Sequence, residues 1–199
     1  ADLEHARHED RRDHDDEATC GVPLAGVDLE IVADDGAAMP VGKIGEIRLR
    51  APGMAAGYLR DPAKTAQRFR GGWFYPGDIG YLRKDGQLVV VGRRDDMINL
   101  NGINIFPAEI ERVLEQHPDI VAAAIVSLES SVHGQVPIAA VELRSGSTTT
   151  PTQILGFARE RLALRAPRRI AIVENMPRNE QGKILKSEVR SLVFPDKRR

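Results

Sequence analysis

Apolar residues in the first half of the chain recur at every second position, which is the spacing of strands that bury one face. Residues 27–32 alternate in this way, and so do residues 44–50, where Ile47 and Leu49 fall on the same side. An Asp-Asp-Gly turn signal follows the first of these runs. The pattern predicts short strands joined by tight turns.

Two further elements complete this half. Residues 84–87 (Lys-Asp-Gly-Gln) lead into the apolar run 88–91, and they predict a hairpin turn because an Asp-Gly pair tolerates positive φ. Residues 62–69 predict a short helix, since Asp61 can cap its first turn and Pro62 suits the first helical position. The first half is therefore predicted to consist of strands and a single helix.

The second half mixes helical and strand spacing. Residues 107–117 predict a helix whose apolar side chains, such as Ile110 and Leu114, lie on one face. Thr150 begins a Thr-Pro-Thr-Gln capping box, which predicts a helix that ends near residue 164. The remaining expected elements are strands at 120–126, 136–143 and 170–173 and a terminal helix at 184–192.

The change of pattern near residues 92–95 predicts a boundary between two folded parts. We expect an α+β protein in which a disordered tail (residues 1–20) precedes a β-rich domain (21–94) and a small α+β domain (95–199). The tail is predicted because residues 1–18 carry many charges and almost no large apolar side chains. Its histidines could bind a metal ion, but without a preformed frame for the ligands a solvated tail is the favoured interpretation.

Composition limits the classes of function. Of the 199 residues, 42% are hydrophobic and 29% are charged, as in folded globular proteins. The formal net charge of −1 gives no overall field that would favour nucleic acid, and no apolar run approaches the ~18 residues of a membrane span. The single Cys20 cannot form an internal disulfide, which is compatible with a cytoplasmic location.

Three residues near the predicted boundary are candidates for nucleotide contacts or for a hinge. Asp78 follows Phe-Tyr-Pro-Gly, and a carboxylate held beside a turn can accept hydrogen bonds from the two hydroxyls of a ribose or simply cap the turn. The guanidinium of Arg93 suits ribose and phosphate oxygens. Asp95 lies where the strand pattern stops, as hinge residues do. On local evidence alone, a solvated charge cluster explains Arg93 and Asp95 at least as well.

Two loops that contain glycine follow. The first is a predicted β-loop with glycine at its apex, and its central residues are Asn101, Gly102, Ile103 and Asn104. Glycine there allows either the close approach of a ligand or a plain turn. In the second loop, Lys183 follows a glycine at a loop-to-helix junction. Its ammonium could stabilise developing negative charge, although an ordinary exposed lysine is the commoner case. No metal site is predicted in the folded part, because no metal-ligand spacing is present there.

In this order, the segments resemble the late motifs of the adenylate-forming enzymes, which include acyl-CoA synthetases, peptide-synthetase adenylation domains and luciferases. The motifs are Phe-Tyr-Pro-Gly-Asp ending at Asp78, Gly-Arg-Arg-Asp ending at Asp95, Gly-Ile-Asn-Ile-Phe-Pro beginning at Gly102, and Pro-Arg-Asn-Glu-Gln-Gly-Lys ending at Lys183. The resemblance covers about residues 20–193. It implies that the β-rich domain is the C-terminal subdomain of a large AMP-binding domain and that the α+β domain is its lid.

The resemblance also implies a role for each candidate residue. Asp78 and Arg93 would hold the ribose, and Asp95 would be the hinge about which the lid rotates. Residues 101–104 would face the pantetheine arm of CoA, and Lys183 would bridge the carboxylate and the α-phosphate during adenylation. The Gly-x-Asn-Ile-aromatic-Pro form of the loop is similar to that of aryl- and fatty-acyl-CoA ligases, which favours a CoA ligase over a peptide-synthetase module.

The implied reaction converts a fatty or aryl acid and MgATP into an acyl-adenylate, and then transfers the acyl group to CoA. No glycine- and Ser/Thr-rich phosphate loop is present in the chain. We therefore expect a C-terminal part that is inactive alone, binds ATP, AMP, Mg²⁺ or CoA at most weakly, and needs an N-terminal partner chain. The alternatives are a non-catalytic stand-alone lid or truncated product, and a fragment of a peptide-synthetase adenylation module.

Overall fold

The computed structural model describes residues 19–130, 132 and 134–194, which form two compact units, one up to Val90 and one from Val91 onward. Both units combine helices with mostly antiparallel strands, and this confirms the predicted α+β class. None of the helices in this described part of the chain is long and apolar enough to cross a membrane.

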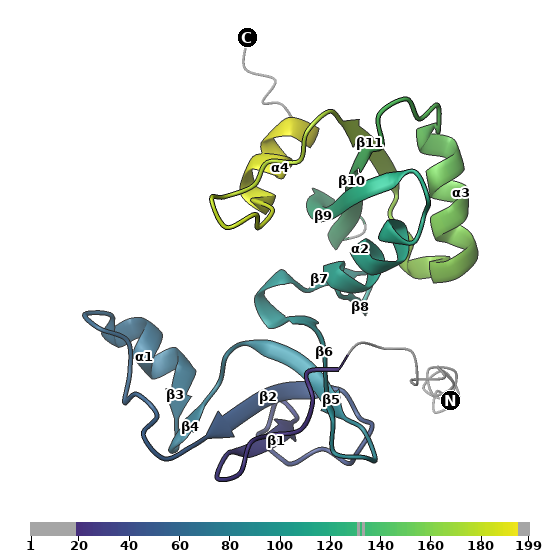
Figure 1. Ribbon diagram of the computed structural model, residues 1–199. Coiled ribbons are helices and arrows are strands. Elements are labelled where there is room, and N and C mark those ends of the chain that lie inside the picture. The colour runs from purple at the N-terminus through teal and green to yellow at the C-terminus, as the bar shows by residue number, and fades with distance from the viewer. Residues whose placement is uncertain (1–18, 131, 133, 195–199) are drawn as a thin grey trace. The chain divides into compact units, whose positions relative to one another are not determined.

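The first unit is a six-stranded sheet with one helix (Figure 1). Its strand order is β3-β4-β2-β5-β6, and β1 pairs antiparallel with β2. The elements are β1 (Asp28–Val32), β2 (Gly45–Arg50), α1 (Pro62–Arg68), β3 (Phe69–Arg70), β4 (Trp73–Phe74), β5 (Asp78–Leu82) and β6 (Leu88–Arg93). The buried apolar residues that hold the sheet together are Ile31, Val32, Ile47, Tyr75, Ile79, Tyr81 and Val89.

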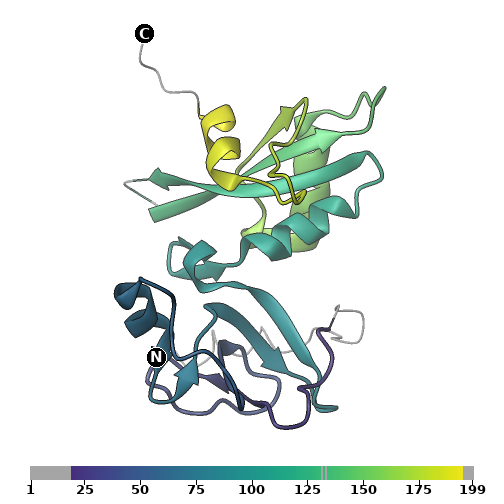
Figure 2. The same cartoon turned by 60° about the vertical axis from the view of Figure 1, so that its left-hand side comes forward.

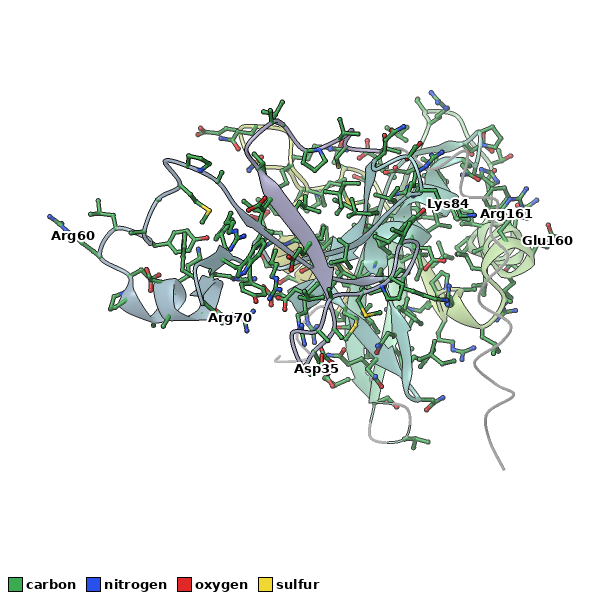
Figure 3. All side chains as sticks on the ribbon, turned by 90° about the horizontal axis from the view of Figure 1, so that it is seen from below. Asp35, Arg60, Arg70, Lys84, Glu160 and Arg161 are labelled. Carbon is green, nitrogen blue, oxygen red and sulfur yellow. The ribbon has the colours of Figure 1, made fainter. Side chains whose placement is uncertain are left out.

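Local signals in the sequence set the turns of this unit. The Asp61 side chain accepts a hydrogen bond from the backbone N–H of Lys64 (2.9 Å), and α1 begins at the following proline, which confirms the predicted cap. Arg60, just before the cap, has a left-handed backbone (φ 56) and projects outward (Figure 3). The predicted hairpin turn closes where the backbone N–H of Arg83 donates to the carbonyl of Gln87 (2.9 Å).

The predicted N-terminal tail lies outside the described residues except for its last two positions. There the backbone N–H of Cys20 donates to the carbonyl of Leu88 (2.8 Å), and the Thr19 hydroxyl is hydrogen-bonded to the Gln87 side chain. Thr19 and Cys20 are therefore hydrogen-bonded to the residues at the start of β6. Apolar patterning does not reveal backbone pairing of this kind.

The second unit is built around β10, which pairs antiparallel with β9 and parallel with β11. Its strands are β7 (Ile98–Leu100), β8 (Ile103–Ile105), β9 (Ile120–Ser130), β10 (Gly134–Leu143) and β11 (Arg169–Val173). Its helices are α2 (Pro107–Glu115), α3 (Pro151–Leu162) and α4 (Lys186–Val193), with short 3-10 turns at Arg94–Asp96 and Ala163–Arg165.

The central strands of this unit are covered on both faces. Helices α2 and α3 lie on one side and α4 on the other (Figure 2). Along β9, Ala123 and Ile125 pack towards α2 and α3, whereas Ala124 and Val126 pack towards α4. Burial on both faces explains why β9 appears in the sequence as a continuous apolar run rather than an alternating one.

Helix α3 begins as predicted and ends slightly earlier. The hydroxyl of Thr150 accepts from the backbone N–H of Gln153 (3.4 Å), and the Gln153 side chain accepts from the backbone N–H of Thr150 (2.9 Å), which is the expected capping box. The helix stops at Leu162, not near residue 164, because Ala163 adopts a left-handed φ of 48° and a 3-10 turn follows.

Candidate functional site

Asp78 is the first residue of β5 and is half-buried. The segment before it is tightly held, since Tyr75 is only 8% exposed and its backbone N–H donates to the carbonyl of Arg68 (2.7 Å). Gly77 has a φ of 85°, and a Cβ built there would lie 1.9 Å from the Arg68 guanidinium. The positive φ favours glycine at this position, whereas the Arg68 side chain could move aside, and the carboxylate of Asp78 is presented from a well-defined turn.

A second arginine fixes the aromatic residue of the same segment. Arg48 donates a hydrogen bond from Nη1 to the Tyr75 hydroxyl (3.2 Å) and another from Nε to Glu30 (2.9 Å). These bonds to Tyr75 and then to Glu30 raise the pKa of Arg48 above its ordinary value. The guanidinium of Arg48 therefore stays charged and supports the Tyr75 side chain behind the Asp78 segment.

In the second unit, the structure brings together two of the motifs, Gly-Arg-Arg-Asp and Gly-Ile-Asn-Ile-Phe-Pro. Arg93 ends β6 with an exposed side chain, and Asp95 is exposed within the 3-10 turn that follows. The ring of Phe106 lies against Gly92, where an added Cβ would be 3.3 Å from the phenylalanine side chain. The chain just before Arg93 is thus packed against the chain just after the β7–β8 loop.

The predicted β-loop is confirmed as a two-residue hairpin turn between β7 and β8. Asn101 and Gly102 occupy its tip with φ values of 51° and 83°, the left-handed conformation that Asn-Gly favours. Asn99 stabilises the turn with two hydrogen bonds. Its Oδ1 accepts from the N–H of Gly102 (3.0 Å), and its Nδ2 donates to the side-chain oxygen of Asn104 (3.1 Å). Ile103 is half-buried, whereas the other residues of the turn are exposed.

Lys183 lies at the end of a small hairpin that is organised by Asn179. The side-chain oxygen of Asn179 accepts from the backbone N–H groups of Gln181 (3.1 Å) and Lys183 (2.8 Å), and the Asn179 N–H donates to the Lys183 carbonyl (2.9 Å). Arg178 donates to the carbonyl of Gly182 (2.9 Å). The loop therefore holds the Lys183 backbone in place while its side chain remains exposed.

Sequence reasoning did not identify Asn99 and Asn179 as parts of the site. Both use a side-chain oxygen to accept from a backbone N–H a few residues later, which is a common role of asparagine in turns. The signal was the position of each asparagine just ahead of a glycine-containing turn. Asn179 in particular supplies the bonds that close the loop.

We expect Asn179→Ala to loosen this hairpin. The backbone N–H groups of Gln181 and Lys183 would lose their shared acceptor, and their protection from hydrogen exchange should fall by about fivefold, as for the loss of a net ~1 kcal/mol hydrogen bond. Amide exchange measured by NMR checks this. Asn179→Asp, which keeps an oxygen acceptor, is the matched control. Unchanged exchange in the alanine variant would contradict the role given to Asn179.

Among residues 19–130, 132 and 134–194, no group of three or more His, Cys, Asp or Glu side chains could hold a metal ion. The histidines of the predicted tail lie outside this range. We therefore assign no metal ligand to the described residues.

Comparison with known proteins shows which family the chain is similar to. Residues 109–183 match the AMP-binding enzyme C-terminal domain. A 2-succinylbenzoate–CoA ligase from Geobacillus kaustophilus is 43% identical over 176 residues, which are 88% of this chain and 36% of that protein. The chain thus spans little more than a third of the length of this relative.

Solved structures give the same result. The amide bond synthetase McbA from Marinactinospora thermotolerans has a TM-score of 0.80 and 36% identity, over 87% of this chain and 36% of its own. The o-succinylbenzoate CoA synthetase MenE from Bacillus subtilis, in complex with the acyl-adenylate OSB-AMP, has a TM-score of 0.79 and 31% identity, over 86% of this chain and 35% of its own. The resemblance seen in the motifs is confirmed: the chain contains a match to the AMP-binding enzyme C-terminal domain and is similar to the C-terminal part of adenylate-forming enzymes.

Proposed function

We propose that this chain is the C-terminal part of an acid–CoA ligase that activates an aromatic carboxylic acid. The observation that carries the proposal is the 43% identity, across 88% of the chain, to a 2-succinylbenzoate–CoA ligase. The name of the MenE neighbour also specifies a succinylbenzoate. Both names favour an aryl acid over the fatty acid that the motifs left open.

In the proposed first step, a carboxylate oxygen of the acid attacks the α-phosphorus of ATP and pyrophosphate leaves with the electrons of the broken P–O bond. Lys183 would approach the carboxylate and the α-phosphate, where negative charge builds up, and a preorganised cation stabilises such charge. Asp78 would accept hydrogen bonds from the ribose hydroxyls and Arg93 would donate to the ribose. The ordered hairpin beneath the exposed Lys183 side chain supports this role.

In the proposed second step, the CoA thiolate attacks the acyl carbon and AMP leaves. Rotation about Asp95 would withdraw Lys183 and bring the turn of residues 101–104 towards the pantetheine arm. Two observations support this part of the proposal. Asp95 lies in an exposed 3-10 turn near the division between the two compact units, and Gly102 offers a turn without a side chain.

The phosphate loop and the acyl pocket would come from an N-terminal partner or segment, because the chain spans 36% of the length of its relative. MgATP and CoA would be substrates of the assembled enzyme. No ligand for Mg²⁺ is assigned to the described residues, and no step of the mechanism depends on one.

An amide-forming enzyme is the second candidate. The structural similarity to the amide bond synthetase McbA, with 36% identity, favours it specifically. In that case the adenylate would form in the same way, but an amine rather than a thiol would attack the acyl carbon. The two candidates therefore share the first step and differ in the second.

Complementation tests the proposal. The whole chain would be fused behind the N-terminal part of the Geobacillus ligase, and pyrophosphate release and acyl products would be measured with aryl and fatty acids. We expect an aryl acyl-CoA product from the fusion and no turnover from the chain alone. The N-terminal part alone is the control. An amide product without a thioester would favour the second candidate, and a folded fusion that forms no adenylate would contradict both.

A further inference from the structure

Helices α2 and α4 lie on opposite faces of the sheet (Figure 2). An ion pair nevertheless connects them around the edge of β9. On one face, Leu114 of α2 packs in the same buried cluster as Ile125 of β9. On the other face, Val189 of α4 packs with Val126. The two apolar clusters are thus separated by the strand itself, and a contact between the helices has to pass around its outer edge.

Glu111 makes that contact. The Nζ of Lys186 lies 2.8 Å from Oε1 of Glu111, and the same oxygen accepts a hydrogen bond from the backbone N–H of Ile125 (2.7 Å). The two charged side chains are 36% and 18% exposed, respectively. One carboxylate therefore joins α4, α2 and the edge of β9, and we refer to Glu111, Lys186 and the Ile125 N–H as the clasp.

Lys186 occupies a position that a lysine does not normally favour. It is the first residue of α4, where the positive end of the helix dipole disfavours a cation, and the preceding Leu185 provides no side-chain cap. The nearby carboxylate of Glu111 offsets this disadvantage. Helix propensity therefore does not explain the lysine, whereas the clasp does.

The clasp acts on the hairpin that carries Lys183. Between Lys183 and Lys186 the chain is tied back to the start of the hairpin, because the N–H of Leu185 donates to the carbonyl of Pro177 (2.9 Å). At the other end, the N–H of Met176 donates to the side chain of Glu142 (2.8 Å). Carboxylates thus anchor one end of the segment to β10 and the other end to α2 and the outer edge of β9.

We propose that Glu111 is a positioning residue for Lys183, acting through Lys186 and α4. This inference rests on the proposed function, in which Lys183 serves adenylation alone. A small displacement of the Lys183 side chain would weaken its stabilisation of the adenylation transition state. The rest of the protein would stay folded. Loss of the clasp should therefore slow the first half-reaction and spare the second.

The test uses the fusion enzyme described above. We expect Glu111→Gln to lower kcat for adenylation by roughly 10–100-fold, the size of effect that a small misplacement of a catalytic group produces, with little change in KM for ATP. Thioester formation from preformed acyl-adenylate should be unchanged. Lys186→Met should lower the adenylation rate by a similar factor. Lys186→Arg, which keeps a cation at the same place, should retain most of the rate.

Glu115→Gln is the matched control. Glu115 lies one turn further along α2 and its Oε1 accepts from the N–H of Ala123 (3.4 Å) on the same strand edge. Among the described residues, no hydrogen bond or ion pair joins Glu115 to α4. If the clasp matters only for stability, Glu115→Gln and Glu111→Gln should behave alike, and the two half-reactions should decline together. That outcome would overturn the inference.

A second measurement separates this inference from the proposed function. In the 199-residue chain itself, backbone ¹⁵N relaxation of residues 183–188 should show increased motion in Glu111→Gln but not in Glu115→Gln. If the unmodified fusion forms no adenylate, the proposed function fails, whereas the relaxation experiment still decides the clasp. Unchanged relaxation in Glu111→Gln would overturn the inference whatever the fusion does.

Discussion

Replacing Lys183 with alanine in the complemented enzyme is expected to slow acyl-adenylate formation by ~10²–10³-fold, the usual effect of removing a single preorganised charge stabiliser. Thioester formation from preformed acyl-adenylate should be nearly unaffected, because the proposed rotation removes this lysine from the reacting atoms before the second step. Single-turnover measurements of the two half-reactions check the prediction. The exposed side chain means that folding should not change.

Gly102→Leu is the matched variant for the second step. Its φ of 83° and its place at the tip of the β7–β8 turn mean that a leucine would both strain the turn and obstruct the approach of a thiol. Thioester formation should therefore suffer more than adenylation. Equal losses in both steps for Lys183→Ala would contradict the two-state assignment, although the family relationship would stand.

The second large effect concerns stability. Leu114 is fully buried (0% exposed) in the cluster beneath α2 and α3, and Leu114→Ala is expected to destabilise this unit by about 2–5 kcal/mol, as for other leucine-to-alanine changes in cores. Because the buried clusters of the second unit contain only its own residues, the first unit should keep its stability.

Two spectroscopic signals can follow the two units separately. The single tryptophan, Trp73, lies in β4 of the first unit, whereas α2, α3 and α4 belong to the second and dominate the helical circular dichroism. In urea, Leu114→Ala should lower the midpoint seen by circular dichroism and leave the fluorescence midpoint unchanged. Gln116→Ala, an exposed position just beyond α2, is the control. A joint shift of both midpoints would mean that the two units unfold as one.

Local signals predicted most of the elements because each was satisfied within a few residues. The cap at Asp61 and the capping box at Thr150 act over three residues, and the apolar face of α2 follows directly from helical spacing. The predicted ends of elements were wrong where backbone hydrogen bonding, and not apolar character, determines where a strand ends. Strand β9 continues to Ser130, well past the apolar run that ends at Val126, because the ladder with β10 continues.

The residues of the candidate site were likewise predicted only in part. The motifs identified residues such as Lys183 and Gly102 from their chemistry and spacing. The side chains that support them were not visible, because the contact of Glu111 with Lys186 and that of Tyr75 with Arg48 join residues far apart in the sequence. Nothing in a single sequence specifies such partners. The roles of Asp78, Arg93 and Asp95 remain predictions that the complemented enzyme can test.

The carboxylates along α2 also affect how this chain behaves towards other copies of itself. The outer edge of a sheet presents backbone donors that can pair with a strand from another molecule and begin aggregation. On β9, Glu111 and Glu115 already occupy the N–H groups of Ile125 and Ala123, two donors on the same edge. An incoming strand would have to displace negatively charged side chains before it could pair there. The helix that helps to form the core thus also protects an apolar strand from intermolecular β-pairing.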